Sequence, residues 1–168
     1  MMTDTIRRIL VPVDFSAHSE RATQYACQLA ARVGARVELL HVVDDPFLSN
    51  AWSPEIYLAA PVQILDELVA DAAIRLSAYT STAERRTVAL HSVVLRGQAA
   101  RMIVAHAAAC DVDLIVMGTH GRTGLSHLLL GSVTERVLRT AACPVLTIRL
   151  RGEPKPSATE PALAYVRL

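Results

Sequence analysis

The chain has 168 residues, of which 52% are hydrophobic and 20% are charged, and its formal net charge at pH 7 is +1. This length suits a single domain with a proper core, and the small net charge gives no electrostatic case for binding nucleic acid or an anionic membrane. Aromatic residues make up only 4% of the chain, which leaves few rings to stack on nucleic-acid bases. No apolar run approaches the roughly 20 residues of a membrane span, and the N-terminus lacks the apolar core of a signal peptide. We therefore expect a cytoplasmic protein without nucleic-acid or membrane partners.

The predicted elements alternate along the chain. Apolar runs that fit buried strands are separated by stretches in which apolar residues recur every three or four positions, as in amphipathic helices. This alternation predicts βαβ units and an α/β fold, with a parallel sheet covered by helices on both faces. The strands are expected at 9–13, 37–43, 88–95, 114–117 and 145–150. The helices are expected from Ser16 or Ser19 to about 33, and at 62–83, 99–109 and 132–141.

Two segments lack this periodicity. Residues 44–61 hold three aromatic side chains and two internal prolines, and a loop of this length in a compact domain is often functional. It is either a hydrophobic flap over the edge of the core, which we favour, or a lid over a ligand. Beyond Arg151 the composition turns rich in proline and charge, so we predict one domain over 1–150 and a tail over 151–168, flexible or docked on a neighbour.

Cysteine and histidine give no metal-binding pattern. The three cysteines are odd in number, widely spaced and without zinc-type spacing, so we expect small buried hydrophobes in a reducing compartment. Three histidines fall in predicted strands or helices, where structural positions are expected. These residues are Cys27, Cys110, Cys143, His41, His91 and His106.

The most informative stretch follows the predicted strand at 114–117. It holds four of the chain's seven glycines, and glycine lets a backbone approach a ligand closely. The glycine loop runs into Ser132 and Glu135, which we interpret as a capping box with Ser132 as N-cap and Glu135 at N3. A helix that starts there leaves N–H groups free and carries a partial positive charge, which favours phosphate. The glycines are Gly118, Gly121, Gly124 and Gly131.

The glycine spacing excludes two common phosphate motifs. There is no Gly-Lys-Ser/Thr, as in a P-loop, and no G-x-G-x-x-G. The stretch instead matches Gly-x2-Gly-x9-Gly-Ser, at Gly118, Gly121, Gly131 and Ser132. In this motif the sequence resembles the ATP-binding branch of the universal stress protein family, over roughly residues 3–150. The segments 8–16, 39–44 and 143–148 also resemble the first, second and last strands of that family.

The resemblance implies a fold and a place for the ligand. The family's fold is adenine nucleotide alpha hydrolase-like, with three layers and a five-stranded parallel sheet in the order 3-2-1-4-5, counted along the chain. Strands one and four are then neighbours, and ligands of such sheets bind in the crevice beyond the carboxyl ends of the strands where the order reverses. Asp14 and Gly118 both stand at such ends, so the fold and the glycine motif indicate the same place.

The resemblance also implies roles for the residues after the first two strands. Pro12, Val13 and Val43 would border the adenine of ATP, or of AMP or ADP, with backbone groups near Val43 reading its edge. Asp14 would lie close to the ribose or to a bound metal, which we expect to be Mg²⁺. Alternatively, Asp14 only caps the turn that follows it.

The glycine loop would hold the rest of the nucleotide. Gly118 and Gly121 would let the backbone approach the ribose and phosphates, and Gly131, Ser132 and Val133 would offer N–H groups to the phosphates. The Ser132 hydroxyl would add a bond or serve only as a helix cap. The remaining expected contacts are Met117, His120, Thr134 and Arg122, the last of which is alternatively a solvated loop residue.

No catalytic set can be argued from the linear sequence, because phosphoryl transfer needs a held Mg²⁺ and a positioned nucleophile. We therefore expect an ATP-binding sensor or regulator of the stress response rather than an enzyme. The alternatives are an interaction module of the same fold without nucleotide, and a slow ATPase. The apolar edge strand, Val145–Leu150, is expected to form a two-fold symmetric homodimer, as in the family.

Overall fold

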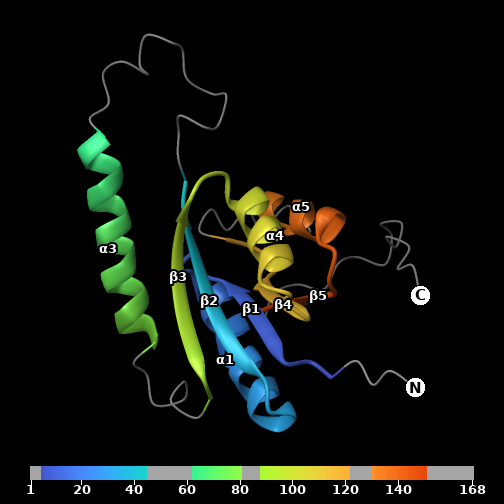
Figure 1. Ribbon diagram of the computed structural model, residues 1–168. Helices are drawn as coiled ribbons and strands as arrows, with labels where there is room; N and C mark the ends of the chain where they lie inside the picture. The colour runs from blue at the N-terminus through green and yellow to red at the C-terminus, as the bar shows by residue number, and fades with distance from the viewer. Residues whose placement is uncertain (1–4, 45–61, 81–87, 122–129, 151–168) are drawn as a thin grey trace.

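The computed structural model describes residues 5–44, 62–80, 88–121 and 130–150. Its centre is a five-stranded, fully parallel sheet in the order β3-β2-β1-β4-β5 (Figure 1). The α/β class and the order 3-2-1-4-5 are therefore confirmed. The predicted flap beyond Asp44, the predicted tail over 151–168 and Arg122 lie outside the described residues. The strands are β1 Arg8–Pro12, β2 Arg36–Val43, β3 Leu90–Arg96, β4 Leu114–Gly118 and β5 Val145–Ile148.

Four described helices cover the sheet in two layers (Figure 1). α1 and α3 pack on one face, and α4 and α5 pack on the other. None of the helices that the structure describes combines the length and the apolarity needed to cross a bilayer. The helices are α1 Ala17–Val33, α3 Val62–Thr80, α4 Ala99–Ala109 and α5 Ser132–Thr140.

Alternation along the strands divides the core into two clusters. Ile9 and Val11 of β1 face the layer of α1 and α3, whereas Leu10 between them faces α4 and α5. The same alternation in β4 directs Val116 to the first layer and Ile115 and Met117 to the second. Because side chains of a strand point to opposite faces in turn, a strand covered on both faces is apolar throughout, as all of β4 is.

Helix α1 has the caps that its sequence predicts. Ser16 is the N-cap, and its side chain accepts a hydrogen bond from the Ser19 backbone N–H. Gly34 ends the helix in the left-handed conformation, with φ 73°, where glycine has no steric penalty. The buried face consists of small side chains, so the helix can lie close to the sheet. They are Ser19, Ala22, Thr23, Ala26, Cys27 and Ala30.

One exposed carboxylate joins the beginnings of β1 and β4. Asp113 Oδ2 accepts hydrogen bonds from the backbone N–H groups of Arg7 (2.8 Å) and Arg8 (2.9 Å), and the Asp113 N–H donates to the Arg8 carbonyl (3.0 Å). The N–H groups of Arg7 and then Arg8 hold the pKa of the Asp113 carboxyl below its usual range. The ionised form of Asp113 is therefore favoured in the folded state.

This contact predicts a pH-dependent stability. Because the pKa of Asp113 is lower in the folded chain, its stabilisation is present above the unfolded pKa, about 3.9, and is lost as the pH falls through the folded value. We expect Asp113→Asn to cost about 1 kcal/mol at pH 7, at the low end for a charged acceptor because the group is exposed. In urea denaturation, the difference from wild type should shrink below about pH 4. A difference that stays constant down to acid pH would contradict this account.

Candidate functional site

A hollow of about 320 Å³ lies at the carboxyl ends of β1, β2 and β4. The connection after β1 leads to α1 on one face of the sheet, and the connection after β4 leads through the glycine loop toward α5 on the other. β1 and β4 are neighbours, so the hollow lies where the chain direction diverges. This is the position in which open α/β sheets bind ligands.

Asp14 shapes the turn after β1. Its Oδ1 accepts hydrogen bonds from the Ser16 backbone N–H (3.0 Å) and the Ser16 hydroxyl (2.6 Å). The residue between them, Phe15, has φ 65°, which is unusual for a bulky side chain. Its ring packs against His41, at a centroid distance of 4.6 Å, and carries the Arg75 guanidinium 4.3 Å above it. These contacts stabilise a strained residue beside the hollow.

The second oxygen of Asp14 faces the glycine loop. A Cβ built on Gly121 would lie 2.8 Å from Asp14 Oδ2. Any larger residue at Gly121 would therefore displace this carboxylate. Asp14 thus caps its turn through Oδ1, which was the alternative interpretation, while Oδ2 remains beside the hollow that Asp14 and Gly121 both line.

Gly118 is needed for helix packing. A Cβ there would lie 2.7 Å from the Cβ of His18 in α1, and 3.0 Å from its carbonyl carbon. The expected role of Gly118, close approach to a ligand, is thus accompanied by a structural one: α1 and the end of β4 can touch only because this position has no side chain. The backbone beyond it continues as Thr119 and His120, whose side chains are joined by a 3.2 Å hydrogen bond.

Three hydrogen bonds hold the end of β4, two of them to the start of α5 and one to β5. The Gly131 N–H donates to the Thr119 carbonyl (2.8 Å), the Thr119 N–H donates to the Ile148 carbonyl of β5 (3.1 Å), and Thr134 Oγ1 donates to the Gly118 carbonyl (2.9 Å). Thr134 is 4% exposed, so its bond is well shielded from water. The N-terminus of α5 is therefore fixed directly beside the strand end.

The predicted capping box at Ser132 is wrong. The N-cap of α5 is Gly131, which makes no side-chain cap bond, and Ser132 is the first helical residue. The Gly131 carbonyl accepts from the Glu135 N–H (2.9 Å), while the Glu135 carboxylate accepts from Arg139 (2.7 Å) instead of turning back to the cap. Consequently the first N–H groups of α5 have no acceptor within the helix, and Ser132 and Val133 both line the hollow.

Not all of the expected residues line the hollow. Val43 does not: its carbonyl accepts from the Gly97 N–H (3.0 Å), and Val42 beside it lines the hollow instead. The expected residues that do line the hollow are Pro12, Val13, Asp14, Met117, Gly118, His120, Gly121, Gly131, Ser132, Val133 and Thr134.

Some lining residues were not anticipated. Asp44 follows β2 as Asp14 follows β1, so the same argument from strand ends would have found it. His41 is buried, and its Nδ1 lies 2.6 Å from the Val13 carbonyl, which makes it the structural histidine that was expected. Ala99 and Ile103 come from α4 and carry no sequence signal for a site. Only the packing of α4 over β2 brings them here.

The hollow combines chemically different walls. Leu40, Val42 and Ile103 are apolar, the start of α5 offers N–H groups, and Asp14 and Asp44 offer carboxylate oxygens. An adenine nucleotide needs an apolar slot, a phosphate site and, with its triphosphate, a hard cation such as Mg²⁺ held by oxygen ligands. The residues present fit such a group.

The family model described as the universal stress protein family matches residues 5–149. The chain belongs to this family. Universal stress protein MJ0531 of Methanocaldococcus jannaschii is 36% identical over 149 residues, which cover 85% of this chain and 82% of that one. Universal stress protein A homolog 2 of Coxiella burnetii is 33% identical over 150 residues, covering 89% and 99% of the two chains.

Solved structures share the fold of this universal stress protein. The structure of protein MJ0577 matches with a TM-score of 0.74 at 28% identity, over 88% of this chain and 98% of that one. A universal stress protein from Archaeoglobus fulgidus, solved in complex with dAMP, matches with a TM-score of 0.58 at 23% identity, over 85% and 98%. At that identity the second likeness shows the fold alone.

The two glycines beside the hollow should differ in their tolerance of a methyl group. Gly118→Ala should cost about 1–3 kcal/mol of unfolding free energy, because its Cβ would overlap α1. Gly131→Ala should cost less, because the nearest atom to its Cβ, the Thr119 carbonyl oxygen, lies 3.3 Å away and its φ of −68° suits alanine. Urea denaturation of both variants tests the order. Equal losses would show that α1 yields to the Gly118 methyl group.

Proposed function

We propose that this universal stress protein binds an adenine nucleotide, ATP in particular, in the hollow at the ends of β1, β2 and β4, and acts as a nucleotide-dependent sensor or regulator in stress. The observation that carries the proposal is the start of α5. There, N–H groups without helical acceptors line the same hollow as an apolar wall and two carboxylates.

The phosphates would bind at the start of α5. The N–H groups of Ser132 and Val133 and the helix dipole favour an anion there. The Ser132 hydroxyl does not cap α5, so it could also donate a hydrogen bond to a phosphate. The bond from Thr134 to the Gly118 carbonyl holds this helix end in position. A preformed site costs little ordering on binding, which favours affinity.

The base would occupy the wall formed by Leu40, Val42 and Ile103. Asp14 and Asp44 would face the ribose or a cation. Two carboxylates beside a triphosphate repel it unless a cation lies between them, so we expect ATP binding to require Mg²⁺. Two universal stress protein structures that share this fold are complexes with cAMP and with dAMP, which is consistent with a nucleotide as the ligand proposed here.

Binding is proposed, and turnover is not. The contacts that argue for the site are binding groups, whereas hydrolysis also needs a positioned water and a group that orients it. An interaction module of the same fold, without nucleotide, is the alternative. It predicts that ATP leaves the stability of the fold unchanged.

The test is the melting temperature in the presence of Mg²⁺ and ATP, ADP or adenosine. At a hundredfold excess over Kd, ATP should stabilise the fold by about 2.7 kcal/mol, which raises the melting temperature by roughly 5–10 °C for a domain of this size. ADP should raise it less and adenosine least, because each lacks phosphate contacts. Chelation of Mg²⁺ should reduce the ATP effect.

An acidic substitution at Val133 should distinguish an effect on phosphate binding from an effect on the stability of the fold. Val133 is 37% exposed at the second position of α5. Val133→Asp should leave the nucleotide-free protein unchanged or more stable, by about 0.3–1 kcal/mol, because an acidic group suits a helix N-terminus. It should abolish most of the ATP effect through repulsion. Val133→Asn, which adds no charge, is the matched control.

If wild type shows no shift with millimolar ATP and Mg²⁺, the interaction-module alternative replaces the nucleotide proposal.

We also propose that the chain forms a homodimer through β5. β5 is an edge strand of the sheet, and it is apolar at Val145, Leu146 and Ile148. The Pro144 and Ile148 carbonyls accept hydrogen bonds from β4. By alternation, the backbone groups of Val145 and Thr147 then point outward, where a second β5 related by a two-fold axis can pair with them.

A proline at the outward position should break this pairing alone. Thr147→Pro removes an outward N–H and no bond to β4, and proline is tolerated at such an edge. Sedimentation at micromolar concentration should show a dimer for wild type and for the matched control Thr147→Val, and a shift toward monomer for Thr147→Pro. A wild-type monomer, or a Thr147→Pro dimer of unchanged affinity, would contradict pairing through β5.

A further inference from the structure

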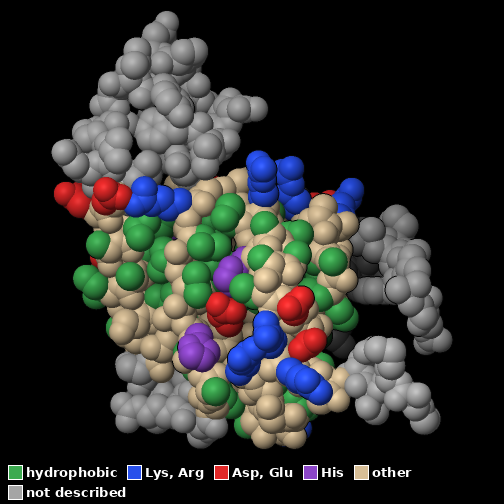
Figure 2. Space-filling model, in the orientation of Figure 1, with side chains coloured by type: hydrophobic (Ala, Val, Ile, Leu, Met, Phe, Trp, Pro, Cys, Tyr) green, Lys and Arg blue, Asp and Glu red, His purple; other side chains and the backbone are tan. Residues whose placement is uncertain are grey.

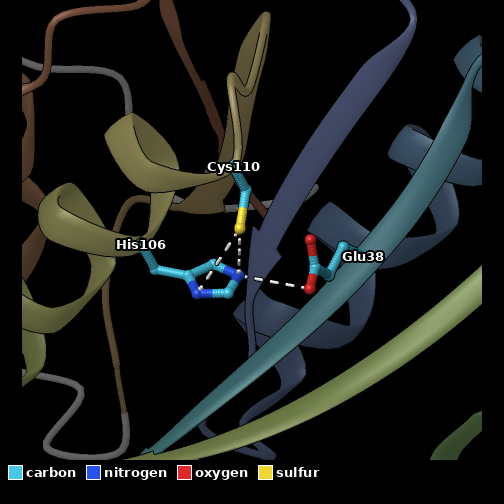
Figure 3. Close-up of side chains that lie close together, drawn as sticks. All are labelled: Glu38, His106 and Cys110. Carbon is cyan, nitrogen blue, oxygen red and sulfur yellow. Dashed lines mark hydrogen bonds and ion pairs between the residues drawn. The ribbon is translucent and has the colours of Figure 1, made fainter.

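Three side chains of metal-ligand type meet away from the hollow, near the beginning of β2. Figure 3 shows Glu38 of β2 pointing toward His106 of α4, with Cys110 directly after that helix. Glu38 precedes Leu40, Val42 and Asp44, which line the hollow, so the cluster lies toward the amino ends of the strands and the hollow lies at their carboxyl ends. The proposed nucleotide site uses none of the three.

Two distances between the ligand atoms are close to those of a tetrahedral zinc site. His106 Nε2 lies 3.1 Å from Glu38 Oε1 and 3.7 Å from Cys110 Sγ, and all three atoms lie within 4.8 Å of one another. Zn–N and Zn–O bonds of about 2.0 Å and a Zn–S bond of about 2.3 Å at tetrahedral angles place nitrogen about 3.3 Å from oxygen and about 3.5 Å from sulfur. The observed pairs differ from these edges by only a few tenths of an ångström.

The backbone holds two of the ligands together. His106 and Cys110 are four residues apart, one helical turn, and the Cys110 N–H donates to the His106 carbonyl (3.0 Å) at the end of α4. Sγ lies 3.7 and 4.0 Å from the two ring nitrogens, so the thiol is beside the ring (Figure 3).

Burial and charge also suit a divalent cation. The side chains of His106 and Glu38 are 13% and 26% exposed, so they are shielded while an ion can still enter. A thiolate, a carboxylate and a neutral imidazole neutralise Zn²⁺ completely, which limits its repulsion from Arg8 and Arg36 nearby. These arginines share with Glu38 and Cys110 a hollow of about 230 Å³, which leaves room for a water as fourth ligand. In Figure 2, His, acidic and basic side chains lie close together on the face that α4 covers.

We propose that Glu38, His106 and Cys110 form a binding site for one Zn²⁺ ion per chain, with water in the fourth position. Mixed sulfur, nitrogen and oxygen ligands in tetrahedral spacing favour zinc over Mg²⁺ or Ca²⁺, which take oxygen ligands. On binding, Cys110 gives up its thiol proton to solvent and forms the Zn–S bond. The bound ion joins β2 to the end of α4, where the metal-free protein has one hydrogen bond between His106 and Glu38.

The competing account is purely structural. His106 and Glu38 then form only a hydrogen bond that holds α4 on β2, and Cys110 is a half-buried hydrophobe. The sequence predicts a structural histidine at His106 and a buried hydrophobe at Cys110. The two accounts differ in whether the thiol takes part. The experiment therefore follows the sulfur.

The full chain is prepared reduced and free of metal, and titrated with Co²⁺ as a coloured substitute for Zn²⁺. We expect one equivalent to bind and to produce a thiolate-to-cobalt charge-transfer band in the near ultraviolet, and Zn²⁺ to displace it. Cys110→Ser should lose this band. Cys110→Ser and His106→Gln should each bind Zn²⁺ at least about 100-fold more weakly than wild type. A direct ligand is worth more than a group that only hydrogen-bonds to a ligand, and loss of such a group costs about 10–100-fold.

Cys143→Ser is the matched control. Cys143 is also half-buried and free, but it lies outside the cluster of three ligands, so it should contribute nothing to binding. The variants are compared by circular dichroism and by melting without metal, and only folded variants are interpreted. Zn²⁺ should raise the melting temperature of wild type and Cys143→Ser but not of Cys110→Ser. A wild-type cobalt spectrum without the thiolate band, or Zn²⁺ affinity unchanged in Cys110→Ser, would overturn the proposal.

Discussion

The contact between α1 and the end of β4 is the constraint on which the rest of the site depends. A methyl group on Gly118 would lie 2.7 Å from the Cβ of His18, so the strand end and the helix can share this position only if it has no side chain. The carbonyl of the same glycine accepts the hydrogen bond of Thr134, which fixes α5. One small residue therefore sets the positions of two helices on opposite faces of the sheet, and the hollow lies between their loops.

The turn after β1 is also fixed in position beside the hollow. Asp14 holds its own turn through one carboxylate oxygen and directs the other toward Gly121. The unusual backbone of Phe15 is compensated by packing with His41 and Arg75. Strain of this kind persists where surrounding contacts determine it. The turn that places Asp14 beside the hollow is thus held by contacts within the protein.

α4 relates the two proposed sites. Its first turns, at Ala99 and Ile103, line the hollow at the carboxyl ends of the strands, and its end carries His106 beside Glu38. This arrangement is general for parallel sheets with crossover helices, because each helix runs back from the carboxyl ends of the strands to their amino ends. Glu38, Leu40 and Val42 all face this helix because alternate residues of β2 share a face.

The sequence by itself determined the elements and the place of the hollow. Apolar runs and helical periodicity predicted every described strand and helix to within a few residues, since these signals are local. The glycine motif and Asp14 indicated the place of the hollow together with the strand order that the resemblance to the family implied. Only the tertiary structure decided the details that depend on facing and packing. Val42 rather than Val43 lines the hollow, and Gly131 rather than Ser132 is the N-cap of α5. Glu38 meets His106 and Cys110 across 68 or more residues. No spacing in the sequence could reveal that meeting, because the packing of α4 on β2 alone creates it.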